Sequence, residues 1–74
     1  MIAYMIQVDA NQVEKLETAI TLLEMQSIAA INCQEQSTII RCQSLIKALK
    51  PLCLEPVLKD RIMKITLLHY AHEL

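Results

Sequence analysis

The sequence contains no glycine in its 74 residues, where average usage near 7% would supply about five. Glycine reaches positive φ without steric cost and allows the backbone to approach a ligand closely. The phosphate-binding loops of nucleotide-binding folds and the nucleophile elbow of hydrolases depend on it. Their absence removes many enzyme classes at once, and we therefore expect a protein that is not an enzyme.

Aromatic residues are almost as scarce, because phenylalanine and tryptophan are absent and Tyr4 and Tyr70 are the only tyrosines. The core must therefore be built from aliphatic side chains, methionine and cysteine. Proteins that bind single-stranded nucleic acid usually stack its bases on aromatic side chains. This composition argues against that mode of binding.

Long apolar runs are also missing, since no stretch reaches the 18 residues typical of a transmembrane helix. The apolar residues 1–8 lack the basic residues that begin a signal peptide. The three cysteines are an odd number, which fits free thiols in a reducing compartment better than a disulfide framework. We therefore expect a cytoplasmic protein with no membrane segment.

What the sequence does contain is an excess of apolar side chains for its length. Hydrophobic residues make up 54% of the chain, against roughly 45–50% in ordinary proteins even when glycine is counted. A domain of about 60 residues buries only about 60% of the surface that its unfolded chain exposes. We therefore expect residues 1–74 to form a single domain that self-associates or binds a protein partner.

The charges are distributed unevenly, although the net charge is only −1. Residues 1–37 carry a net charge of −4, and residues 38–74 carry a net charge of +3. Two explanations fit this asymmetry: the halves neutralise each other by packing together, or the basic half binds an acidic or nucleic-acid partner. We favour the first, because no helix-turn-helix signature is present. The candidate basic patch consists of Lys47, Lys50, Lys59, Arg61 and Lys64.

The hydrophobic pattern at the start of the chain predicts a strand followed by a helix. Residues 2–8 alternate between two faces, as a strand does. Asp9 can cap a helix that runs to about Gln26. This helix has one apolar stripe, formed by Val13, Leu16, Ile20 and Leu23.

The middle of the chain predicts a hairpin and a second, short helix. Residues 28–33 and 38–43 are expected to be strands, joined by a four-residue loop at 34–37. The short helix begins at Ser44, which can act as its cap. Pro51 ends it, because the residue before a proline disfavours the helical region.

The resulting order, β-α-β-β-α, matches the first five elements of a ferredoxin-like split βαβ unit. We therefore predict an α+β fold, with an antiparallel sheet and two helices on one of its faces. Residues 63–71 are one candidate for the closing strand, since several of them suit a sheet. Alternatively, residues 54–58 form an edge strand and a C-terminal helix begins at Asp60. That helix would carry a heptad-like stripe of Met63, Leu67, Tyr70 and Leu74.

Histidines and cysteines form the one set that resembles metal ligands. His69 and His72 would share a face on a helix but not on a strand. The cysteines lack C-x-x-C spacing, and the predicted hairpin buries Cys33 and Cys42 at opposite ends of one face. Cys53 lies outside the hairpin and is the thiol we expect to be exposed. We predict neither a metal nor a cofactor.

These observations favour a small protein-binding or regulatory module that acts as a homodimer, as a larger assembly or with a protein partner. A nucleic-acid-associated regulator that uses the basic patch is the alternative, and a metal or redox protein is a third. Methionine and aromatic side chains are enriched in interface cores. The predicted partner-binding residues are Met63, Leu67, Leu68 and Tyr70.

Overall fold

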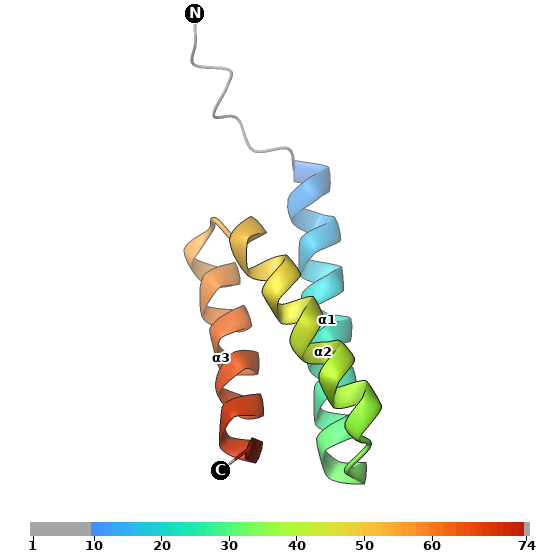
Figure 1. Cartoon of the computed structure of the whole chain (residues 1–74). Helices are drawn as coiled ribbons and strands as arrows, with labels where there is room; N and C mark the ends of the chain where they lie inside the picture. The colour runs from blue at the N-terminus through green and yellow to red at the C-terminus, as the bar shows by residue number, and fades with distance from the viewer. Residues whose placement is uncertain (1–9, 74) are drawn as a thin grey trace, which may run out of the picture.

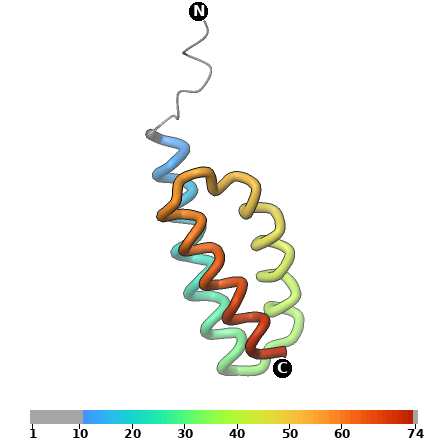
Figure 2. The backbone as a smooth tube through the Cα atoms, turned by 90° about the vertical axis from the view of Figure 1, so that its left-hand side faces the viewer, coloured from blue at the N-terminus to red at the C-terminus, as the bar shows by residue number. Residues whose placement is uncertain are grey.

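The computed structural model describes residues 10–73, which form a bundle of three α-helices (Figure 1). Helix α1 spans Ala10–Cys33, α2 spans Gln36–Leu49 and α3 spans Pro56–Glu73, and a short 3-10 helix, η2 (Lys50–Leu52), follows α2. Helices α1 and α3 run in the same direction and α2 runs in the opposite one. The tube in Figure 2 shows α3 lying along α1, with α2 returning beside both.

Each helix buries a stripe of residues spaced three or four apart, the spacing that places side chains on one helical face. The stripes meet along the bundle axis, where Ile20, Cys42 and Ile62 are among the most deeply buried residues. Because β-branched and sulfur-containing residues supply most of this core, no aromatic ring is needed to fill it. The buried stripe of α1 contains Ile20, Leu23, Ser27 and Ala30, that of α2 contains Ile39, Cys42 and Ile46, and that of α3 contains Leu58, Ile62, Ile65 and His69.

Helix α1 ends in a Schellman motif built without glycine. Gln34 adopts a left-handed backbone conformation with φ 56°. The Glu35 amide donates a hydrogen bond to the Ala30 carbonyl at 2.9 Å, and the Gln34 amide donates one to the Ile31 carbonyl at 3.2 Å. These bonds satisfy carbonyls that would otherwise be unpaired at the helix end. The left-handed conformation is the cost, since a side chain at this position clashes with its own backbone.

The connection between α2 and α3 uses both prolines of the chain. Pro51 lies inside η2, where the helix tightens and ends. Pro56 is the first residue of α3, a position at which its missing N–H is not needed and its fixed φ already suits the helix. The Glu55 carbonyl accepts the first helical hydrogen bond, from the Lys59 amide at 2.9 Å.

The predicted α+β, ferredoxin-like fold is wrong, since the structure contains no strand between residues 10 and 73. Residues 28–33 continue α1, and residues 38–43 belong to α2. The predicted loop at 34–37 does contain the turn, but this turn joins two helices. Short apolar runs fit a strand or a buried helix equally well, and only their continuation decides between the two. Here Ser27 and Ala30 continue the buried stripe of α1 beyond Gln26.

The predicted helix that ends near Gln26 is present and continues to Cys33. The predicted helix at Ser44 begins eight residues earlier, at Gln36. Of the two alternatives for the C-terminus, the structure contains the helix, which begins at Pro56 and therefore includes part of the expected edge strand. The strand predicted at 2–8 lies outside the described residues. None of the helices between residues 10 and 73 combines the length and the hydropathy needed to cross a bilayer.

Replacing Gln34 with glycine should stabilise the protein. The Gln34→Gly variant removes the left-handed strain, so we expect its free energy of unfolding to rise by about 0.5–1 kcal/mol. Urea denaturation measures this change. Gln26→Gly is the matched control, because Gln26 is exposed within α1 and glycine there should cost about 1 kcal/mol. Loss of stability in both variants would contradict the assigned end of α1.

Candidate functional site: exposed apolar faces of the bundle

The outer face of α3 consists of Met63, Leu67 and Tyr70, which point away from the bundle core. Their exposed fractions are 42%, 56% and 60%. Their spacing of four and three residues places them on one side of the helix, opposite the buried stripe. Leu68, which we predicted to belong to this set, is half-buried and lies on a different side of α3. The structure therefore groups three of the four predicted partner-binding residues.

A second apolar patch, the outer face of α1, is formed by Leu22 and Met25. Their exposed fractions are 54% and 62%. Together the two patches belong to a larger surplus, because among the described residues eleven large apolar side chains are exposed and ten apolar residues are buried. The sequence-based prediction did not include the α1 patch. The three-residue spacing of Leu22 and Met25 within a predicted helix could have indicated it. The other exposed members of the surplus are Ile28, Ile40, Leu45, Leu52, Leu54 and Val57.

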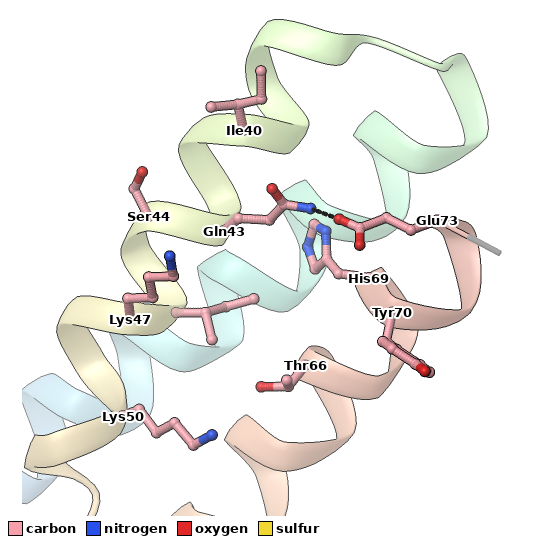
Figure 3. Close-up of a pocket in the computed structure, with 10 residues that line it drawn as sticks. Ile40, Gln43, Ser44, Lys47, Lys50, Thr66, His69, Tyr70 and Glu73 are labelled. Carbon is pink, nitrogen blue, oxygen red and sulfur yellow. Dashed lines mark hydrogen bonds between the residues drawn. The ribbon is translucent and has the colours of Figure 1, made fainter.

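A groove of about 510 Å³ separates α2 from α3 on the side away from α1 (Figure 3). Lys47 and Lys50 of α2 and η2 lie towards one end of this groove. At the other end, the Gln43 side-chain amide donates a hydrogen bond to the Glu73 carboxylate at 2.8 Å. The groove is open to solvent, and its polar side chains are spread along its length. They therefore do not converge on a single ligand atom.

The structure does not gather the candidate basic patch on one face. Lys47 and Lys50 line the α2–α3 groove. Arg61 instead faces α1, where its guanidinium donates a hydrogen bond to Thr21 Oγ1 at 2.9 Å and lies 3.9 Å from the Glu24 carboxylate. Lys64 pairs with Asp60 at 3.1 Å, one turn away. Lys59 is exposed at the start of α3.

A buried polar pair, His69 and Ser27, joins α3 to α1 inside the core. His69 Nε2 and Ser27 Oγ share a hydrogen bond of 2.8 Å. The exposed fraction of His69 is 4% and that of Ser27 is 0%. His69 Nδ1 is also buried and has no hydrogen-bond partner among the described residues. Although a serine beside a histidine can serve as a nucleophile and its base, no substrate can reach Ser27 in this core, and no third group orients the ring.

Burial is the main reason why the pKa of His69 is lowered from its ordinary value of 6.5. The nearby charge of His72 lowers the pKa further, while Glu73 acts in the opposite direction. A buried imidazole resists protonation because the charged form loses its hydration. Folding therefore favours the neutral form of His69.

The three cysteines are free; Cys42 is buried as predicted, whereas the predictions for Cys33 and Cys53 are wrong. Cys33 is exposed at the end of α1, whereas Cys42 is buried in the core. Cys53, which we expected to be exposed, is buried, and its Sγ donates a hydrogen bond to the Leu49 carbonyl at 3.3 Å. Burial raises the pKa of the Cys53 thiol above its ordinary value. Within residues 10–73, no three histidine, cysteine or acidic side chains come together in a way that could hold a metal ion.

Comparisons with protein-family models, with curated proteins and with solved structures found no match to this chain. Interpretation of the surface therefore depends on its geometry and chemistry.

The buried histidine should make stability depend on pH. Because folding lowers the pKa of His69, its neutral form is fully stabilising above about pH 6.5, and stability falls as the pH decreases from there towards the folded-state pKa. The slope from this one group is at most about 1.4 kcal/mol per pH unit. Urea denaturation between pH 5 and 8 should show this loss, which His69→Gln should remove.

His72→Gln is the comparison variant for this measurement. It removes the smaller of the two effects that lower the pKa of His69 and leaves the burial in place. Most of the pH dependence should therefore remain in His72→Gln. An equal pH dependence in the wild type and in His69→Gln would show that another group is responsible.

The thiols should differ in reactivity. In the folded protein, a thiol reagent should modify Cys33 rapidly, while Cys42 and Cys53 should react only after denaturation, since both are buried. Mass spectrometry after brief labelling should find one modified cysteine in buffer and three in guanidinium chloride. Rapid labelling of all three in buffer would contradict the placement of Cys42 and Cys53.

Proposed function

We propose that this chain is a non-enzymatic protein-binding module that acts through self-association, and that the outer face of α3 makes the contact. The observation that carries the proposal is the row of Met63, Leu67 and Tyr70 along one exposed side of a regular helix. Isolated exposed apolar residues are normal on a protein surface, whereas an aligned group marks an interaction site.

The physical reason for association is the surplus of apolar surface. Each buried side chain of the size of leucine or methionine contributes roughly 1.5–3 kcal/mol when it is fully removed from water. A 74-residue chain has a small interior, and the described part of this bundle leaves eleven large apolar side chains exposed. Association with another molecule is the remaining way to bury them.

The outer face of α3 suits this role better than the other exposed apolar residues do. Its three side chains have the heptad-like spacing with which one helix packs against another. Methionine adapts its shape to a partner, and tyrosine adds apolar area together with a hydroxyl that can stay hydrated. By contrast, Leu52 and Leu54 belong to the connection between α2 and α3 and do not form a helical row.

The alternative functions gain no comparable support. A nucleic-acid interface would be expected to place its cations on one face, and Arg61 lies on the opposite side of α3 from the groove that Lys47 and Lys50 line. A redox or metal role would be expected to use clustered thiols or imidazoles. The free cysteines are consistent with a reducing compartment, and we keep the cytoplasm as the proposed location.

The proposal predicts that a charge on the outer face of α3 abolishes association. Sedimentation equilibrium at micromolar concentration should give a mass above that of one chain for the wild type and that of a single chain for Leu67→Asp. Leu54→Asp is the matched control, because Leu54 is exposed but lies outside the row. A monomeric wild type would contradict the proposal, as would equal effects of the two substitutions.

A further inference from the structure

We propose that the outer face of α3 binds the outer face of α1 in a second copy of the chain, with the two helices parallel. This inference rests on the proposed function and goes further, because it names the partner surface and the symmetry. The contact therefore joins two different faces, one from each copy, and does not pair two identical faces.

The two faces match in shape because they have the same residue spacing. On α1, Thr18, Leu22 and Met25 are separated by four and three residues and are all exposed. On α3, Met63, Leu67 and Tyr70 have the same separation. A parallel alignment therefore places Leu22 beside Leu67 and Met25 beside Tyr70, which forms two apolar layers.

The third layer pairs Thr18 with Met63. Here α1 has a shallow hollow of about 280 Å³, lined by Asn11, Glu14, Lys15 and Thr18. The flexible Met63 side chain suits an irregular depression of this kind. The smaller residue on α1 thus faces the longer residue on α3.

The charged residues beside the two outer faces favour the same alignment. It places Lys15 of α1 opposite Asp60 of α3, one turn before the third layer. The same alignment brings Glu14 of α1 near the part of α3 where Lys59 and Lys64 lie beside the outer face. Neither Glu14 nor Lys15 has an ion-pair partner within residues 10–73. Lys64 has only its exposed contact with Asp60, and exposed pairs of this kind contribute little.

Pairing of two identical faces lacks this complementarity. Two copies of the α3 face would bring Lys59 and Lys64 of both chains to one interface. Two parallel copies of the α1 face would place Lys15 of one chain opposite Lys15 of the other. Like charges at an interface cost free energy and suppress such pairings.

The orientation is also compatible with the fold. Because α1 and α3 run in the same direction within one bundle (Figure 1), a second bundle placed alongside presents its α1 parallel to the first bundle's α3. The contact is heterologous, so each added copy leaves one α1 face and one α3 face open. Such contacts produce rings or open chains instead of closed dimers.

A mixing experiment tests this arrangement. Leu67→Asp blocks the α3 face and leaves the α1 face intact, whereas Met25→Asp does the reverse. Both residues are exposed, and far-UV circular dichroism checks that each variant is still helical. We expect each variant alone to be a monomer and the equimolar mixture to form a complex of one copy of each, which native mass spectrometry resolves by mass.

The other outcomes overturn the inference in distinguishable ways. A dimer of Met25→Asp alone would show that two α3 faces pair, so the proposed function would stand and this inference would fall. Monomers before and after mixing, with an associating wild type, would also refute the α1–α3 contact. A monomeric wild type would refute the proposed function itself.

Exchanging two charges provides a second test that leaves the apolar residues of both outer faces unchanged. Glu14→Lys and Lys64→Glu should each weaken the association of the wild type by about two- to fivefold, as expected for exposed ion pairs. The double variant should recover most of the lost affinity. Weakening in the double variant equal to the combined single effects would contradict the register.

Discussion

Contact among the three buried stripes holds this bundle together, because each helix buries one stripe and all three stripes meet along one axis. The most deeply buried side chains, such as Ile20 and Ile62, are aliphatic, and the cysteines between them act as small apolar residues. The single polar contact in this core is that of His69 with Ser27 among the described residues. A helix bundle needs no residue with positive φ except where a helix ends, which is why a chain without glycine can form one.

The sequence predicted the positions of breaks better than the type of structure between them. The turn within 34–37, the end of α2 shortly before Pro51 and much of α1 follow from local signals that the structure reproduces. The hairpin was wrong because residues 28–33 alternate as a strand does, while the continuation of the helix passes through Ser27, a buried polar residue. Ser27 is buried with a hydrogen bond to His69, forty-two residues later in the chain. No local pattern could reveal such a long-range pairing.

The candidate surface was predicted in part for a similar reason. Met63, Leu67 and Tyr70 have a spacing that is visible in the sequence, so the helical alternative identified them as a stripe. Leu68 was grouped with them by composition, although helical spacing already places it on a different side of α3. The basic residues formed a group by sequence position, but their separation depends on contacts such as that of Arg61 with Thr21. Charge composition alone does not determine how a helix distributes its charges in space.

Fold and proposed function share one cause, the ratio of apolar side chains to interior volume. A short bundle of narrow helices can bury one stripe from each of them, and further large apolar residues stay exposed, among them those on the outer faces of α1 and α3. Thermal unfolding followed by circular dichroism over an about hundredfold range of protein concentration tests this account most directly, since association stabilises the folded state by mass action. The account predicts a midpoint temperature that rises with concentration for a helical protein. A midpoint that does not change across that range would contradict it.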